Sequence, residues 1–162
     1  MQTVILLLGI GVFAVIAYGD VRRRRIPNAL AIAVAVLGLV RLMLAADPRA
    51  ALYTLVAATA IFAVSFLMFW RGWIGGGDAK LLPAATLLVG FHDVPSFLLL
   101  MSLCGGVLAI AVLAASKFGG PLGYLLPGAA VVEPPDRPSV PYGVAIALAG
   151  VMVLVLQHSV VK

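Results

Sequence analysis

Charge and cysteine are both scarce in this 162-residue chain, and each shortage excludes a class of protein. Only 10% of the residues are charged, against roughly 25% in an ordinary soluble domain. Hydrophobic residues make up 64% of the chain, which excludes a disordered chain and a plain cytosolic enzyme. The only cysteine is Cys104, so an internal disulfide is impossible and a secreted disulfide scaffold is excluded.

Acidic residues are also few, because six Asp and Glu stand against eleven Lys and Arg, for a net charge of +5. A basic chain can indicate nucleic-acid binding, but no aromatic residues are interleaved with the basic ones and no binding motif accompanies them. Four of the eleven basic residues instead form one run, Arg22–Arg25, directly after an apolar stretch. This pattern is typical of the cytoplasmic end of a membrane helix, and we expect no nucleic-acid partner.

Long apolar runs dominate the rest of the sequence. A helix needs about 20 apolar residues to cross the roughly 30 Å hydrocarbon core of a bilayer. Runs of this kind, the fourth of them short, occupy Met1–Gly19, Ile26–Ala46, Ala50–Trp70, Leu81–His92, Val94–Ser116 and Pro138–Val161. Arg41 interrupts the second run near one end, from which a long side chain can reach the interface. We therefore predict an all-α polytopic membrane protein with six transmembrane helices. Residues 1–162 form one integral-membrane domain, and a glycine-rich unwound loop precedes the short fourth helix.

The basic residues predict the orientation of these helices. With the N-terminus outside, eight Lys and Arg lie at the inner side and three at the outer side, as the positive-inside rule requires. The inner group is Arg22, Arg23, Arg24, Arg25, Arg71, Lys80, Lys117 and Arg137, and the outer group is Arg41, Arg49 and Lys162. A cleaved signal peptide is disfavoured, since its basic residues precede the apolar region.

Glycine and proline gather in one long segment before the last apolar run. Residues 118–132 read FGGPLGYLLPGAAVV, and a proline-heavy stretch follows up to Val140. Proline breaks helices because it lacks a backbone donor and clashes with the preceding turn. We expect an inner loop here, partly embedded in the membrane, rather than a seventh straight helix.

Two of the six acids are predicted at the same inner boundary of the membrane. Asp20 ends the first apolar run, and Asp78 directly precedes the fourth. The 14 steps from Asp78 to His92 span roughly 21 Å as a helix, which is less than the membrane thickness. If His92 marks the outer surface, Asp78 lies within the bilayer depth, where an acid usually faces the bundle interior or a water-filled cavity. Gly75–Gly77 suit an irregular backbone that lines such a cavity.

Each acid alone has a simpler explanation. Asp20 could pair with the neighbouring arginines, and Asp78 could pair with Lys80 or serve as a helix N-cap. The two together favour a shared site, because they lie on one side at matching depth in an acid-poor chain.

A pair of carboxyl groups has a specific chemistry. Two close carboxyls share one proton. The protonated member can polarise a carbonyl while the ionised member activates water, which is peptide hydrolysis without a metal or a covalent nucleophile. No HExxH motif, serine elbow or Cys–His pair competes in the sequence, and His92 and His158 are predicted at the outer side. Helix dipoles favour an ionised Asp78 as the base and a protonated Asp20 as the acid.

These motifs match a known family. Asp20 is followed by basic residues and Ile26-Pro27-Asn28, and the second acid stands in Gly75-Gly76-Gly77-Asp78-Ala79-Lys80. This pair of motifs resembles the type IV prepilin peptidases, which are membrane aspartic proteases with a GxGD motif. The small size is similar to the Flp-pilus (TadV/CpaA) branch. Residues 141–145, PYGVA, are similar to another family segment near the active site.

The resemblance implies an aspartic endopeptidase that cleaves the basic leader of Flp-type prepilins and pseudopilins at the cytoplasmic face of the bacterial inner membrane. Asp20 and Asp78 would be the catalytic pair, and the site-supporting residues would be Gly75, Gly76, Gly77, Lys80, Pro141, Tyr142 and Gly143. No metal or cofactor is implied, because the paired CxxC motifs of the larger branch are missing. Arg22, Arg23, Arg24 and Arg25 would lie near anionic lipid headgroups, since a basic leader would be repelled by them.

Two alternatives belong to other classes. A small proton-coupled transporter could use either acid as its carrier, but it needs an acid that is accessible from both sides, and both acids are predicted inside. A non-catalytic subunit of a pilus or secretion machine is the third interpretation. Only the protease would shorten a co-expressed prepilin.

Overall fold

The computed structural model describes residues 2–23, 26–118 and 142–160. Its α-helices are α1 (Gln2–Arg23), α2 (Asn28–Met43), α3 (Pro48–Trp70), α4 (Gly76–Val89), α5 (Val94–Phe118) and α7 (Tyr142–Val160), and a 3₁₀ turn, η1 (Phe91–Asp93), joins α4 to α5. No strand occurs in these described ranges, which confirms the all-α class. The predicted inner loop and Pro141 lie outside the described residues.

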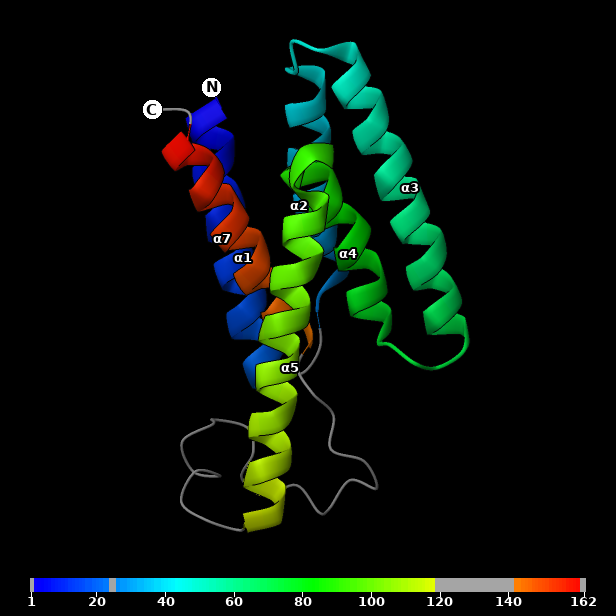
Figure 1. The fold of residues 1–162 in the computed structure, drawn as a ribbon, viewed down its shortest axis with the longest axis vertical. Helices are drawn as coiled ribbons and strands as arrows, with labels where there is room; N and C mark the ends of the chain where they lie inside the picture. The colour runs from blue at the N-terminus through cyan, green and yellow to red at the C-terminus, as the bar shows by residue number, and fades with distance from the viewer. Residues whose placement is uncertain (1, 24–25, 119–141, 161–162) are drawn as a thin grey trace.

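The helices run alternately up and down in one bundle (Figure 1). The start of α1 and the end of α7 lie side by side at the top of this view. At the opposite end, α1 and α3 finish and α2, α4 and α7 begin, and we name this the site end; the other is the far end. Asp20 lies near the end of α1 and Asp78 near the start of α4, so both acids belong to the site end.

Four stretches are long and apolar enough to cross a membrane: Thr3–Arg22, Pro48–Trp70, Phe91–Ala114 and Tyr142–Ser159. The chain is therefore an all-α polytopic membrane protein. Helix α2 is a shorter apolar helix, and α4 has only 14 residues. The number of six crossing helices remains a prediction.

The shortest helix is the most enclosed one. α4 packs against α2, α3 and α7, and half of its residues are buried, including Leu81, Thr86 and Leu88. The long helices instead turn apolar side chains outward, as Ile110 of α5 does with 69% exposure. Because lipid is as apolar as these side chains, such a surface is stable in a bilayer, and it shields α4.

Glycines bring the helices around α4 into close contact. A Cβ at Gly38 of α2 would lie 2.7 Å from the Cβ of Leu87 in α4, and one at Gly150 of α7 would lie 2.6 Å from the ring of Phe13 in α1. Small residues let membrane helices approach at backbone distance. Gly38 thus lets α2 pack closely against α4, which carries Asp78. Gly150 lets α7 pack closely against α1, which carries Asp20.

Several helix boundaries differ from the sequence-based prediction, and two of them bear on the acids. α1 continues to Arg23 instead of ending near Gly19, so Asp20 is still helical. Gly76 and Gly77 form the first turn of α4, and the unwound part is restricted to residues 71–75. Packing explains why glycines occur inside the helix: added Cβ atoms at Gly76 and Gly77 would each lie 3.1 Å from a side-chain carbon, of Phe69 and Ile26 respectively. These two glycines serve close approach rather than unwinding.

Candidate active site

Asp20 is buried at the junction of α1 and α7, with 6% exposure. Its Oδ2 accepts the backbone N–H of Val144 at 3.2 Å. Val144 belongs to the first turn of α7, whose N–H groups have no partners within the helix. The positive end of a helix dipole and a free amide suit an anionic acceptor. The start of α7 therefore provides a binding position for the Asp20 carboxylate.

Gly143 makes this approach possible. A Cβ at Gly143 would lie 2.7 Å from Oδ2 of Asp20 and 2.9 Å from its Cγ, which is closer than Cβ atoms approach in proteins. Any side chain at this position would displace the carboxylate. Gly143 was expected to support the site, and the geometry brings it against Asp20.

Asp78 is the third residue of α4 and is half-buried. The N-cap is Gly75, which has an extended backbone and makes no side-chain cap hydrogen bond. The explanation of Asp78 as an N-cap residue is therefore wrong. A Cβ at Gly75 would lie 3.3 Å from Oδ2 of Asp78, so the carboxyl group leans back over the start of the helix and leaves Gly75 no free space on that side.

Lys80 does not neutralise Asp78. Its ammonium group donates to Oδ1 of Asn28 at 3.2 Å, and no ion pair joins Lys80 to Asp78 in the described part of the chain. Asn28 is the last residue of the Ile-Pro-Asn motif, so this contact ties the two sequence motifs together across α2 and α4.

Ile26 is the residue that the helix ends share. A Cβ at Gly77 would lie 3.1 Å from the Cβ of Ile26, and one at Gly143 would lie 2.7 Å from its Cδ1. Gly77 precedes Asp78 in the chain, and Gly143 touches Asp20. The side chain of Ile26 therefore lies between the two acid-bearing regions. In the sequence, Ile26 stood out only as part of the Ile-Pro-Asn motif. The Val144 amide could not be predicted, because a backbone donor leaves no sequence signal.

The first turn of α4 is also held from α3. Pro83 lies inside α4 and has no N–H, so the Ala79 carbonyl lacks its donor within the helix. The buried Ser65 hydroxyl of α3 donates to the Ala79 oxygen at 3.1 Å. This replacement lets a proline occur one turn beyond Asp78 without leaving an unpaired carbonyl in the bundle.

The two acids interact electrostatically. Asp78 lies outside the four stretches that are long enough to span a membrane. Burial raises the pKa of Asp78, and the charge of Asp20 raises it further, to about 6. A raised pKa favours the protonated form. The helix-dipole argument for Asp78 as the ionised base left out burial and the second carboxylate, both of which favour its protonated form. Which acid holds the proton stays a prediction.

The other expected site residues lie at the same end with weaker contacts. Tyr142 is 45% exposed, and a Cβ at Gly105 of α5 would lie 3.5 Å from its ring, so the ring packs toward α5. Arg22 extends over the ring of Tyr18, 5.1 Å from its centroid. Among the described residues, no group of three or more His, Cys, Asp or Glu side chains could hold a metal ion.

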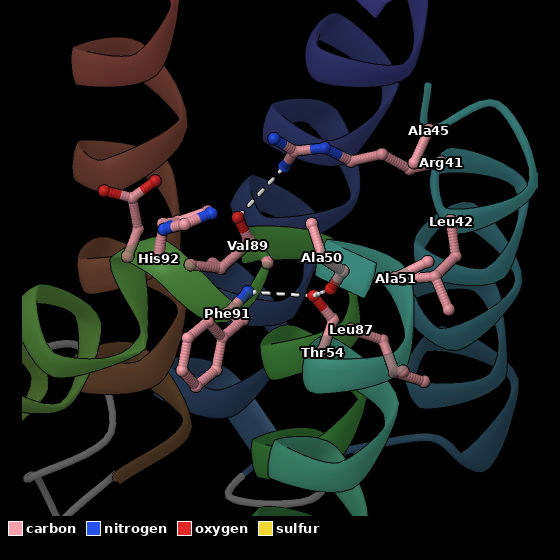
Figure 2. A pocket seen from close by; sticks show the side chains of 12 residues that line it. Arg41, Leu42, Ala45, Ala50, Ala51, Thr54, Leu87, Val89, Phe91 and His92 are labelled. Atoms are coloured by element: carbon pink, nitrogen blue, oxygen red, sulfur yellow. Dashed lines mark hydrogen bonds between the residues drawn. The ribbon is translucent and has the colours of Figure 1, made fainter. Parts of the chain in front are cut away.

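A cavity of about 150 Å³ lies at the far end. Figure 2 shows it between the end of α2, the start of α3 and the end of α4, with Arg41, Thr54 and Phe91 among its lining residues. His92 also lines it. The cavity is separated from both acids by the length of α4 and is not part of the candidate active site.

Comparison with known proteins identifies the family. Residues 7–110 match the type IV leader peptidase family, a range that includes Asp20 and Asp78 but not the start of α7. The chain is 38% identical over 82 residues to a protein named prepilin peptidase EppA from Methanothermobacter thermautotrophicus. The match covers 47% of this chain and 21% of that relative, so the chain spans about a fifth of the relative's length. No solved structure matches the chain. The chain belongs to the type IV leader peptidase family.

Proposed function

We propose that this chain is an aspartic endopeptidase that cleaves the basic leader of type IV prepilins, of the Flp type, at the cytoplasmic face of the bacterial inner membrane. Family membership supports leader cleavage, and a relative that is named a prepilin peptidase supports prepilins as the substrates. The observation that carries the aspartic mechanism is the electrostatic interaction of two acids, on separate helices, whose surroundings meet at Ile26.

The two carboxyl groups have different surroundings, which suits different roles. Asp78 has a pKa raised to about 6, which brings its protonated form closer to neutral pH, and we assign it the proton at the start of the reaction. Asp20 accepts the Val144 N–H, a bond that is stronger to an ionised acceptor, and starts the reaction as the carboxylate. One proton shared between two acids is the state that aspartic chemistry requires.

In the first step, Asp20 removes a proton from a water molecule as its oxygen attacks the scissile carbonyl carbon. Asp78 donates its proton to the carbonyl oxygen, and a neutral gem-diol results. In the second step, the diol returns a proton to Asp78 and the C–N bond breaks. Asp20 passes its proton to the leaving nitrogen. The sum is the addition of one water molecule, and both acids regain their starting states.

The start of α4 suggests how the leader binds. The exposed Gly75 has extended backbone angles, φ −71° and ψ 148°, directly before the turn that carries Asp78. An extended peptide can pair with an extended backbone through main-chain hydrogen bonds. On this proposal the leader lies beside residues 71–75, and Gly76 and Gly77 hold the helix against its neighbours.

The test is co-expression with a tagged prepilin. The wild-type chain should convert the prepilin to a shorter product, whereas Asp20→Asn and Asp78→Asn should not, although both remain in the membrane. Full cleavage by the Asp78→Asn protein would end the proposal. A transporter or an assembly subunit would leave the prepilin uncut in every case.

A further inference from the structure

The carboxyl end of α4 lies among helices that are longer than it is. The last four carbonyl groups of a helix accept no hydrogen bond from within the helix. A carbonyl left without a donor is costly where water is excluded. A helix long enough to cross the bilayer can place these groups at the membrane surface. A 14-residue helix enclosed by α2, α3 and α7 needs donors from its neighbours.

Side chains from three helices meet this end. The Arg41 guanidinium of α2 donates to the carbonyls of Leu88 and Val89, the latter at 3.2 Å. Gln157 of α7 donates through Nε2 to the same Val89 carbonyl at 2.7 Å and to Asp93 at 2.6 Å. Figure 2 shows Arg41 extended to the Val89 carbonyl, and the Phe91 N–H directed at the Thr54 hydroxyl of α3, 3.0 Å away.

Arg41 was expected to turn outward to the membrane interface, and its actual position is different. The side chain is partly buried and points into the bundle. A cation at a helix C-terminus is favourable because the carbonyl ends carry partial negative charge. The carboxylate of Asp93 also attracts Arg41. This placement is not explained by topology alone.

The helices that supply these donors also hold the candidate active site. The chain just before α2 contacts the start of α4 through Ile26, and α2 itself does so through Asn28. The start of α7 holds Asp20 through Val144. Gln157 lies thirteen residues further along α7, or about 20 Å at 1.5 Å per residue. Each of α2 and α7 therefore touches one acid-bearing region at one end and the carboxyl end of α4 at the other.

We propose that Arg41 and Gln157 are positioning residues: they clamp the carboxyl end of α4 and thereby hold Asp78 at the depth where it meets Asp20. This inference rests on the proposed function. Ser65 and Lys80 also hold the first turn of α4, through the Ala79 carbonyl and Asn28. The far-end clamp holds the terminal carbonyls of Leu88 and Val89 and so adds the contacts that resist sliding of the helix along its axis. Sliding by a fraction of a turn would separate the two carboxyls without unfolding the bundle.

Kinetics test the clamp in the whole 162-residue chain in lipid nanodiscs, with a purified prepilin as substrate. Arg41→Met and Gln157→Leu should each lower kcat roughly 10- to 100-fold, as misplacement of reacting groups does, with little change in KM. Arg41→Lys keeps a cationic donor and should recover part of the loss. Arg49→Met is the matched control, because Arg49 is an exposed arginine at the same end and should cleave at the wild-type rate.

Disulfide trapping gives a readout that does not depend on cleavage. A Cβ at position 77 would lie 3.1 Å from the Cβ of Ile26, close to the roughly 3.5–4.5 Å of a disulfide. An Ile26→Cys, Gly77→Cys pair in a Cys104→Ala background should therefore cross-link quickly with copper phenanthroline in air. Adding Arg41→Met or Gln157→Leu should slow the cross-link several-fold.

The outcomes separate the two proposals. Unchanged kcat and unchanged cross-linking in both clamp variants would overturn the clamp. A smaller yield of folded protein with unchanged kcat per folded molecule would also overturn it, since Arg41 and Gln157 would then be structural only. If Arg41→Met does not fold, Gln157→Leu and Arg41→Lys provide the answer. A wild-type chain that leaves prepilin uncut would reject the proposed function, and slowed cross-linking would still support the clamp on α4.

Discussion

The two ends of α4 are held in different ways. At the far end, charged and amide side chains from α2 and α7 take the terminal carbonyls. At the site end, the helix begins without a side-chain cap, and glycines let Phe69 and Ile26 approach its backbone. Charged and amide donors thus take the terminal carbonyls away from the acids, whereas close packing and the Ser65 and Lys80 hydrogen bonds hold the site end. The start of α4 packs closely against its neighbours, and the carboxyl group of Asp78 is left for chemistry.

The largest expected effect comes from removing one acid at the site end. Asp20→Asn or Asp78→Asn should lower the rate of leader cleavage by roughly 10²- to 10⁴-fold, the range of general acid–base catalysis. Cleavage of a purified prepilin, followed on gels, measures this. Asp47→Asn is the control: Asp47 caps α3 at the far end, where it accepts the Arg49 N–H at 2.9 Å, and its loss should leave the rate unchanged. Equal losses in all three proteins would contradict a site restricted to one end.

Gly143→Ala should have the next largest effect. The added Cβ would lie 2.7 Å from Oδ2 of Asp20, so the carboxylate must move away from the Val144 amide. We expect a fall in kcat of roughly 10- to 100-fold in a protein that still inserts into the membrane. Gly19→Ala is the matched control, because nothing lies within 4 Å of a Cβ there. A Gly143→Ala protein with wild-type kcat would show that the position of Asp20 is not critical.

The pH dependence of cleavage tests the division of roles between the two acids. Burial and Asp20 raise the pKa of Asp78 to about 6. The protonated form of Asp78 is the proposed donor, so within the pH range in which the Asp20 base is ionised, activity should be lost as the pH rises through this pKa, about tenfold per pH unit beyond. The pH profile of kcat measures the effect. A kcat that keeps rising well above pH 6 would return Asp78 to the role of the ionised base.

Lys80→Met should have the smallest effect. Lys80 is exposed and donates to Asn28, and contacts of this kind contribute about 1 kcal/mol or less. Cleavage should fall only a few-fold, and a thermal unfolding curve should shift slightly. Asn28→Ala removes the same contact from the other side and should lower the cleavage rate by a similar, small factor. A loss as large as that of Asp78→Asn would mean that Lys80 acts on the substrate directly.

The fold class and the location of the acids were accessible from the sequence, for identifiable reasons. Apolar runs of membrane length predicted the all-α polytopic class, and the start of α4 at a glycine-rich stretch was predicted to within a few residues. The roles of Gly76 and Gly77 could not be predicted, because a glycine can indicate either an unwound backbone or close packing. The positions of Phe69 and Ile26 show that both glycines serve close packing.

Composition and motif spacing by themselves determined that this chain is a helical membrane protein with two notable acids, since burial in lipid requires long apolar helices and leaves few places for charge. The surroundings of each acid depend instead on how the helices pack. The Val144 amide, the Ile26 side chain and the inward turn of Arg41 all depend on contacts between residues distant in the chain. Local patterns carry no record of such contacts. They arise when α4 packs between α2, α3 and α7.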